Sequence, residues 1–365
     1  MIVHKKKKKT VFVAMSGGVD SSVAAALLKS KGYRVAGITM CFNISLAPGK
    51  RPSCCGADAI EDAKRVAQTL NIPHYVLNFG KELSDHVIDP FVDEYLSGRT
   101  PNPCVRCNQY VKFGTLLKKA KALGADYLAT GHYAQVSRGI WNKSFKLKKG
   151  VQGSKDQSYF LYQIRKEDLP FILFPLGSLV KSKVRKLAKR YNLKNAQKKE
   201  SQDICFVPDS GYQKFIRDRA GEEVTSIGPI KDKNGKILGE HQGVAFYTIG
   251  QREGLGIAVG KPMYIYKIDK EENAIYVGDK NLLLSKEFSV KDVNFISCDI
   301  PKKEIEVKVK IRYNHPEVKA RLVCQKSGEV KLYLKRAQSS VTPGQSAVFY
   351  RNNVVLGGGI INEVF

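Results

Sequence analysis

Ser16-Gly17-Gly18-Val19-Asp20-Ser21-Ser22 lies between two apolar runs, residues 11–15 and residues 23–28. This order predicts a buried strand, a glycine turn and the first turn of a helix. Two adjacent glycines let the backbone approach an anion without interference from a Cβ atom, and the N–H groups at a helix start attract that anion. We therefore predict a phosphate site; the alternative is a glycine–serine turn that only caps the helix.

The composition of this stretch indicates which phosphate chemistry it suits. In the Gly-x-x-x-x-Gly-Lys-[Ser/Thr] loop of many ATPases, a lysine reaches the terminal phosphates. Residues 16–22 contain no lysine but supply three serine hydroxyl groups. This favours a site for pyrophosphate as a leaving group over transfer of the terminal phosphoryl group. Asp20 is a candidate ligand for Mg²⁺ or for one of its waters.

The charge of the chain predicts a polyanionic partner. Lys and Arg number 61 and Asp and Glu number 34, so the formal charge is 61 − 34 = +27. The excess is uneven, because residues 138–199 hold 17 basic and three acidic side chains. Six basic residues crowd one expected helix: Lys181, Lys183, Arg185, Lys186, Lys189 and Arg190. The alternative is a lysine-rich composition with no specific partner.

Length, hydropathy and cysteine usage narrow the class of protein. A chain of 365 residues predicts two or three domains. No apolar run approaches the ~20 residues that span a bilayer, and the N-terminus lacks the apolar segment of a secretory signal, so we expect a cytoplasmic protein without a membrane partner. In that compartment the eight cysteines argue against a disulfide scaffold and for catalytic, redox or metal use of some thiols.

The first half of the chain alternates expected strands and helices. Strands are expected at 11–15, 33–40, 74–79 and 126–130, and helices at 21–31, 57–70 and 113–123. This alternation is typical of a parallel sheet with helices on both faces, a Rossmann-like α/β fold. Ligands bind beyond the carboxyl ends of such strands. Ser16, Met40 and Gly131 follow or end three strands, so we expect them to meet at one nucleotide.

The second half reads as β-structure. Glycines punctuate short apolar pieces from about residue 208 onward, as in a small β-rich domain. After residue 284 apolar and basic residues alternate, as in Val307-Lys308-Val309-Lys310, which predicts a small antiparallel barrel with one basic rim. The expected domains are 1–207, a catalytic domain; 208–284, a central β-rich domain; and 285–365, a C-terminal barrel that binds RNA.

Two cysteine segments are candidates for chemistry. Residues 100–108 hold Cys104 and Cys107 in a stretch that two prolines predict to be a loop. Arg106 lies between the two thiols, where a cation favours the thiolate. Cys205 lies in an apolar stretch and has two open interpretations, a buried filler or a functional thiol.

With these residues in view, the chain resembles a known family. Residues 16–22 resemble the PP-loop of the ATP pyrophosphatase superfamily, whose members join AMP to a carbonyl or amide oxygen and release pyrophosphate. The whole chain resembles tRNA-specific 2-thiouridylases. The matching stretches are the PP-loop, residues 102–108, 130–133 and 155–161, the segment around Cys205, and residues 248–252, 312–313 and 342–345.

The resemblance implies an activity, ATP-dependent 2-thiolation of the wobble uridine of tRNA, and roles for residues. Cys107 would be the nucleophile and Cys205 the carrier of persulfide sulfur, delivered by a sulfur carrier or a cysteine desulfurase. ATP with Mg²⁺ would bind Ala14, Met15, Ser16, Gly17, Gly18, Val19, Asp20, Ser21, Met40 and Gly131. The target base would face Asn102, Pro103 and Cys104. The tRNA would contact His132, Lys155, Asp156, Gln157, Arg312, Tyr313 and Gln345, although each of these also has an interpretation as an ordinary surface residue.

One position departs from the family pattern. Many members place Asp three residues before the nucleophilic cysteine, where this chain has Cys104. A thiol has a reference pKa of about 8.5 and Asp one of about 3.9, so an acid/base role does not carry over unchanged. Cys104, Cys107 and Cys205 are also candidate ligands of an iron–sulfur cluster or of zinc.

Two other classes of protein are compatible with parts of the pattern. Another PP-loop enzyme that modifies tRNA, or an adenylating amidotransferase, would not need the pair Cys107 and Cys205. A tRNA-binding protein without catalysis would need the basic stretches and the barrel but no intact PP-loop.

Overall fold

The computed structural model describes residues 8–42, 57–139, 144–198, 204–208 and 210–365. Cys54 and Cys55 are adjacent, an arrangement that binds one metal poorly and so predicts a structural role, but both lie outside these residues. Within the described ranges, no helix combines the length and the hydropathy that a membrane crossing requires.

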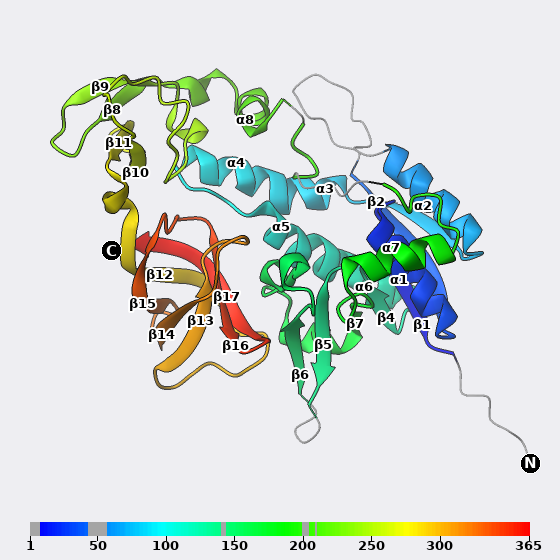
Figure 1. Ribbon diagram of the computed structural model, residues 1–365. Coiled ribbons are helices and arrows are strands. Elements are labelled where there is room, and N and C mark those ends of the chain that lie inside the picture. Colours follow the sequence, from blue (N-terminus) through cyan, green and yellow to red (C-terminus); the bar gives the residue numbers. More distant parts are fainter. Residues whose placement is uncertain (1–7, 43–56, 140–143, 199–203, 209) are drawn as a thin grey trace, which may run out of the picture.

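A five-stranded parallel sheet forms the core of the first half (Figure 1). Its order is β3-β2-β1-β4-β7, with β3 at His74–Asn78, β2 at Arg34–Cys41, β1 at Thr10–Ala14, β4 at Tyr127–Ala129 and β7 at Ile172–Leu173. Alternate side chains of β1 pack into two different hydrophobic cores, one on each face of the sheet. Val11 and Val13 pack in one, and Phe12 packs in the other. Because both faces of the central strand are buried, the expected parallel sheet covered on both sides is confirmed.

Helices occupy both faces of this sheet. On the face of Val11 and Val13 lie α1 (Val19–Ser30), α2 (Ala57–Thr69) and α7 (Lys181–Arg190), and Figure 1 shows α7 beside α1. The opposite core contains residues of α3 (Gly80–Leu83), η1 (Ser84–Ile88), α4 (Asp89–Leu96), α5 (Pro103–Arg106), η2 (Cys107–Leu116) and α6 (Leu117–Ala122). The two β1 faces thus lie against different sets of helices.

The segment with Cys104 and Cys107 is helical, so its expected loop conformation is wrong. The helix starts at Pro103 and runs through α5, η2 and α6, whereas the pattern predicted a start at residue 113. Proline is tolerated in the first turn of a helix, where its missing N–H would have no partner. Asn102 caps the helix, since its side-chain oxygen accepts a bond from the N–H of Val105 at 3.4 Å. Pro103 therefore begins this helix instead of preventing it.

The central domain is a small mixed sheet with one helix. The sheet has the order β10-β11-β8-β9. Its elements are α8 (Tyr212–Ala220), η6 (Glu222–Thr225), β8 (Gly228–Lys231), β9 (Ile237–His241), η7 (Val244–Phe246), β10 (Tyr264–Asp269) and β11 (Ala274–Gly278). The glycine-punctuated pattern from residue 208 onward therefore does correspond to β-rich structure.

The C-terminal part is an antiparallel barrel, as expected. The strands β12 (Leu284–Asn294), β15 (Val330–Ser339), β14 (Val318–Cys324), β13 (Ile305–Lys310), β16 (Ser346–Arg351) and β17 (Val354–Val364) follow one another in the sheet, and a β12–β17 pairing closes it. Val307 and Val309 are buried while Lys308 is exposed. The observed alternation of apolar and basic residues thus separates the core from the outer surface.

A hairpin from the first half of the chain extends the barrel sheet. Strands β5 (Ala134–Arg138) and β6 (Phe145–Lys149) pair with each other, and Lys148 of β6 pairs with Val354 of β17. Short helical turns complete the described elements: η3 (Gly153–Lys155), η4 (Ser158–Phe160), η5 (Lys166–Phe171) and η8 (Lys280–Leu283). The sequence pattern did not predict this hairpin, which joins the first half of the chain to the barrel.

Candidate active site

The loop after β1 is a tight cradle of backbone and serine hydroxyl groups. The Ser21 hydroxyl accepts a bond from the N–H of Ser16 at 3.2 Å and donates to the carbonyl of Gly18 at 3.2 Å. The Ser22 hydroxyl donates to the same carbonyl at 2.8 Å. Gly18 is the N-cap of α1 and has no side chain to bond the first-turn N–H groups. N–H groups at a helix start attract anions, so this geometry is compatible with the phosphate site, which stays a prediction.

Positions 17 and 131 require glycine, because neighbouring backbone atoms leave no room for a Cβ atom. Gly17 has φ +69°, and a Cβ atom there would lie 2.3 Å from the carbonyl oxygen of Ala59. Gly131 follows β4, and its Cβ atom would lie 2.7 Å from the backbone nitrogen of Ser21. Met40 is near the end of β2, the other neighbour of β1. The three carboxyl-end positions therefore do meet at one edge of the sheet.

A lysine far along the chain reaches the loop that lacks one. Lys181, the first residue of α7, lies with its Nζ 2.8 Å from both carboxylate oxygens of Asp20. The Tyr133 hydroxyl donates to the same carboxylate at 2.8 Å. Asp20, the candidate Mg²⁺ ligand, is thus already paired. The sequence does not distinguish Lys181 from the other basic residues of α7, but Lys181 is only 8% exposed.

Asn195 is a second residue that the sequence analysis missed. Its side-chain amide donates to the carbonyl of Gly17 at 2.9 Å and to the Ser22 hydroxyl at 2.9 Å. Asn195 is buried, and its Oδ1 atom has no hydrogen-bond partner among the described residues. These two hydrogen bonds hold the loop in position. No spacing rule connects Asn195 to the loop, because the two are 178 residues apart.

The three candidate thiols influence one another electrostatically. Cys107 is buried, whereas Cys104 and Cys205 are solvent-accessible. Enough protein surrounds the latter two thiols that burial raises the pKa of Cys104, and burial and the neighbouring Cys107 raise that of Cys205 to about 12. The opposing influence on both is the ammonium group of Lys112. The side chains of Cys104, Cys107 and Cys205 therefore lie close enough together to affect one another's ionisation.

The described cysteines differ in their bonding. Cys104, Cys107, Cys205, Cys298 and Cys324 are free thiols, and Cys41 is disulfide-bonded. The catalytic, redox or metal use of some of these thiols stays a prediction, and Cys41 is an exception to the expected lack of disulfide bonding. Among the residues that the structure describes, no group of three His, Cys, Asp or Glu side chains is placed to hold a metal ion. The metal-ligand hypothesis for Cys104, Cys107 and Cys205 thus stays a prediction without structural support.

The C-terminal barrel holds the segment before the cysteines. The Gln345 side chain donates to the carbonyls of Thr100 and Pro101 at 3.0 and 3.1 Å. The N–H of Thr100 donates to the carbonyl of Pro343 at 3.0 Å. Asn102 lines a cavity of about 280 Å³ between this segment and the barrel, together with Arg106, Tyr110, Gln163, Asp292 and Ser346. Gln345 thus lies against the two residues that precede Asn102.

The expected RNA-contact residues around β5 differ in exposure. Asp156 is buried, and its carboxylate accepts bonds from the N–H groups of Gly150 and Ser158. The Gln157 side chain accepts a bond from the N–H of Tyr133 at 2.9 Å. Lys155 precedes them on η3 and is partly exposed. Asp156 and Gln157 therefore fix this turn, and Lys155 is the more accessible of the two charged residues.

His132 and the barrel residues complete the expected set. His132 follows β4 at the carboxyl edge of the sheet; its ring nitrogen lies 2.7 Å from the Thr130 hydroxyl oxygen, and burial lowers its pKa well below the usual value. Tyr313 packs on Phe160, with ring centroids 4.6 Å apart, and Arg312 beside it is exposed. The Arg312 side chain thus remains available on the barrel.

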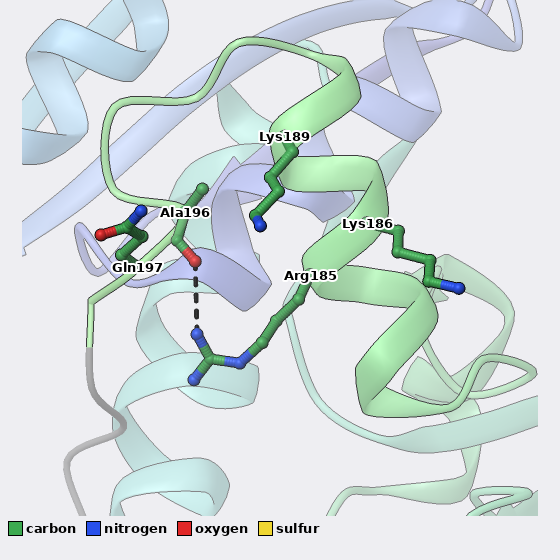
Figure 2. Close-up of a pocket in the computed structure, with 5 residues that line it drawn as sticks. All are labelled: Arg185, Lys186, Lys189, Ala196 and Gln197. Carbon is green, nitrogen blue, oxygen red and sulfur yellow. Dashed lines mark hydrogen bonds between the residues drawn. The ribbon is translucent and has the colours of Figure 1, made fainter.

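A basic groove of about 370 Å³ lies beside α7 (Figure 2). Arg185, Lys186 and Lys189 line it, together with Ala196 and Gln197. Figure 2 shows Arg185 reaching the Ala196 carbonyl, a bond of 3.3 Å. Basic residues of α7 thus line a groove. This groove is near the PP-loop, because Asn195, which bonds to Gly17, directly precedes the lining residue Ala196.

Comparison with known proteins agrees with the fold and the order of its parts. Three family models match successive parts of the chain. The tRNA methyl transferase HUP domain matches residues 9–209, and the tRNA methyl transferase PRC-barrel domain matches residues 213–279. The aminomethyltransferase β-barrel domain matches residues 285–361. The tRNA-specific 2-thiouridylase MnmA of Acetivibrio thermocellus is 48% identical over 97% of this chain and 99% of its own. The chain belongs to the tRNA-specific 2-thiouridylase family.

A second relative matches over nearly the whole chain. The 2-thiouridylase of Carboxydothermus hydrogenoformans is also 48% identical, over 98% of each chain. A solved 4-thiouridine synthetase–RNA complex with bound ATP is 18% identical, covers 57% of this chain and 50% of its own, and has a TM-score of 0.34, which is too low to support an argument. The 2-thiouridylase relatives therefore carry the assignment.

Proposed function

We propose that this protein thiolates the C2 position of the wobble uridine of tRNA, using ATP and a cysteine persulfide. One observation carries the proposal: an anion cradle at Ser16–Ser22 and a pair of interacting thiols, Cys107 and Cys205, occur in one chain of a 2-thiouridylase family. The basic groove beside α7 and the basic barrel surface suit a polyanionic substrate.

In the first half-reaction the uridine oxygen becomes a leaving group. The C2 oxygen attacks the α-phosphorus of ATP, a bond to AMP forms, and pyrophosphate leaves. Loop N–H groups and serine hydroxyls would bind the departing phosphates, and Lys181 would offset their charge. Mg²⁺ would supply further charge neutralisation; the Asp20 carboxylate becomes a ligand if Lys181 shifts from it to a phosphate.

In the second half-reaction sulfur replaces that oxygen. The terminal sulfur of the Cys205 persulfide bonds to C2, and AMP leaves with the oxygen. The Cys107 thiolate then attacks the sulfur of Cys205 and breaks the persulfide bond, whose electron pair stays on the sulfur that becomes C2=S. A disulfide between Cys107 and Cys205 remains, and a thiol reductant reopens it. Cys107 is the nucleophile of this step and Cys205 the carrier.

The remaining roles concern binding. Asn102, Pro103 and Cys104 would face the target base, which must leave the anticodon stack. His132, Lys155, Asp156, Gln157, Arg312, Tyr313 and Gln345 would contact or position tRNA. A persulfide-donating sulfur carrier or cysteine desulfurase would reload Cys205, and the reaction would take place in the cytoplasm.

The test separates adenylation from sulfur transfer. Cys205→Ser should still release AMP and pyrophosphate in a tRNA-dependent manner but should form no 2-thiouridine, measured by nucleoside mass analysis. Cys324→Ser, a free thiol of the barrel, is the matched control and should thiolate normally. Normal thiolation by Cys205→Ser would refute the sulfur-carrier role, and AMP release without any thiolation by the unmodified protein would favour another adenylating enzyme.

A further inference from the structure

The turn after β6 is held together by a buried carboxylate. Asp156 is 4% exposed, and its Oδ1 atom accepts hydrogen bonds from the N–H groups of Gly150 and Ser158 at 2.9 and 3.1 Å. Its Oδ2 atom accepts a third bond, from the Ser158 hydroxyl at 2.9 Å. A satisfied buried network of this kind makes a segment rigid. Residues 150–158, the Asp156 turn, are therefore expected to move as one unit.

Gln157 of this turn holds Tyr133 at two points. Its N–H donates to the Tyr133 carbonyl at 2.9 Å, and its side-chain oxygen accepts a bond from the Tyr133 N–H at 2.9 Å. Tyr133 is only 3% exposed, and its hydroxyl donates to the Asp20 carboxylate at 2.8 Å. One buried residue therefore connects the Asp156 turn to the PP-loop.

A second connection runs from the same turn to α7. The Gln152 side-chain oxygen accepts a hydrogen bond from the N–H of Lys181 at 2.7 Å. Val180, the N-cap of α7, makes no side-chain bond to the first N–H groups of that helix, so Gln152 supplies an acceptor there. The Lys181 Nζ atom lies 2.8 Å from both carboxylate oxygens of Asp20. Among the described residues, the side chains that bond Asp20 are those of Tyr133 and Lys181, and the Asp156 turn is bonded to both.

These contacts place two proposed binding elements in one hydrogen-bond network. The Asp156 turn carries Lys155 and Gln157, which would contact tRNA, and Asp20 would lie at the phosphates of ATP. We infer that Tyr133 is a positioning residue, through which tRNA bound at the turn holds Asp20 in place and so tightens the binding of ATP. This inference rests on the proposed function, because that function supplies both ligands.

The physical reason lies in the bonds of Asp20 when ATP binds. If Lys181 shifts to a phosphate, the Tyr133 hydroxyl is the partner that still holds the carboxylate among the described residues. Gln157 fixes the Tyr133 backbone, so a tRNA contact that stabilises the turn also stabilises this bond. Coupling between two binding sites is reciprocal, so ATP must tighten the binding of tRNA by the same factor.

The first experiment measures this coupling without chemistry. The Kd of α,β-methylene ATP, an analogue that cannot release pyrophosphate, is measured by titration calorimetry without tRNA and with saturating tRNA. In the unmodified protein tRNA should lower this Kd about tenfold, and in Tyr133→Phe by about twofold or less. The affinity of Tyr133→Phe for tRNA alone should be unchanged, because the residue is buried. Tyr75→Phe, at a half-exposed tyrosine of β3 in the same sheet, is the matched control and should keep the full factor.

Two results of this experiment would overturn the inference. One is an unmodified protein in which tRNA leaves the Kd of the analogue unchanged. The other is a Tyr133→Phe variant that binds the analogue more weakly but by the same ratio with and without tRNA. A hydroxyl that only shapes the nucleotide site would give this second result, so the ratio separates positioning by tRNA from a local structural role.

A pair of variants at Gln157 tests the other end of the connection. Gln157→Glu keeps an oxygen that can accept the Tyr133 N–H, whereas Gln157→Leu does not. Both remove the amide N–H groups that could contact RNA, so their difference reports the bond to Tyr133. At saturating tRNA, Gln157→Glu should keep the tenfold factor and Gln157→Leu should lose it. Equal factors in the two variants would overturn the inference, and this pair decides it if Tyr133→Phe does not fold, as judged by circular dichroism.

The inference and the proposed function fail in different ways. If the unmodified protein showed the coupling factor but never formed 2-thiouridine, the proposed function would fail and the inference would stand. If it formed 2-thiouridine and showed no coupling factor, the inference alone would fail.

Discussion

Lys181 and Asp20 form a two-point ion pair that joins the start of α7 to the PP-loop, with Nζ 2.8 Å from each carboxylate oxygen. The Lys181 side chain is 10% exposed and the Asp20 side chain 30% exposed. A partly buried pair of this kind orients the loop as well as balancing its charge. Lys181 thus supplies from a distant helix the cation that the loop sequence lacks.

The first prediction concerns this pair. Lys181→Met leaves the Asp20 carboxylate with the Tyr133 hydroxyl as its remaining hydrogen-bond partner among the described residues. We expect the KM for ATP in tRNA-dependent AMP release to rise by about tenfold, and stability to fall by about 1–3 kcal/mol. Lys183→Met, on the exposed side of the same helix, is the control and should behave like the unmodified protein. An unchanged KM in Lys181→Met would contradict the assignment.

The second prediction concerns the contact between Gly131 and the loop. A Cβ atom at Gly131 would lie 2.7 Å from the nitrogen of Ser21 and 2.9 Å from the carbonyl carbon of Asp20, both backbone atoms. Gly131→Ala should therefore displace the loop and reduce AMP release by at least about tenfold. Gly153→Ala introduces the same methyl group where nothing lies within 4 Å and should be nearly neutral. Full activity in Gly131→Ala would show that the loop tolerates displacement.

The third prediction concerns Asn195, whose side-chain amide donates hydrogen bonds to Gly17 and Ser22. Asn195→Ala removes two buried hydrogen bonds and leaves the Gly17 carbonyl without this donor. We expect a loss of about 1–3 kcal/mol in the free energy of unfolding, measured by urea denaturation. The KM for ATP should also rise. A destabilised variant with an unchanged KM would limit Asn195 to a structural role.

The fourth prediction is a dependence of stability on pH. Burial lowers the pKa of His132, so the folded state favours the neutral ring. The resulting stability is present above the unfolded pKa of about 6.5 and is lost as pH falls below it, by at most about 1.4 kcal/mol per pH unit. His132→Asn should make this acid-side slope shallower in urea titrations. His74, His241 and His315 also have lowered pKa values, so part of the slope should remain.

The fifth prediction concerns the groove beside α7. Replacing both Arg185 and Lys189 by Glu should weaken tRNA binding at about 0.1 M salt and reduce the salt dependence of affinity by about one to two units of slope. Lys31→Glu reverses an exposed charge at the opposite end of α1 from the PP-loop and is the control. An unchanged salt dependence in the double variant would show that phosphates bind elsewhere.

The sequence predicted the parts of the fold that depend on local pattern. The strand–loop–helix unit around Ser16 and the alternation at Val307–Val309 follow from periodicities that the sheet and the barrel preserve. The carboxyl-edge position of Gly131 follows from the parallel order of strands, which the alternating pattern implied. The prolines around Asn102 misled the interpretation, because Pro103 starts a helix instead of continuing a loop.

The missed residues depend on tertiary contacts. Lys181 is 161 positions from Asp20, and neither its neighbours nor its spacing distinguish it from the exposed lysines of α7. Asn195 lies in an irregular segment after that helix. The π-helical winding of η2 has no marker in the sequence that periodicity analysis detects. Burial of a polar residue is the signal common to Lys181 and Asn195, and only the folded chain reveals it.

The bonds from Gln345 to Thr100 and Pro101 have a consequence for dissecting the protein. A fragment that ends before β12 would retain the whole nucleotide loop and every thiol of the site. It would nevertheless lose the two hydrogen bonds by which Gln345 holds the segment before Cys104. The barrel is therefore not a detachable module, and exchanging it between relatives would alter the reactive centre unless both halves were exchanged together.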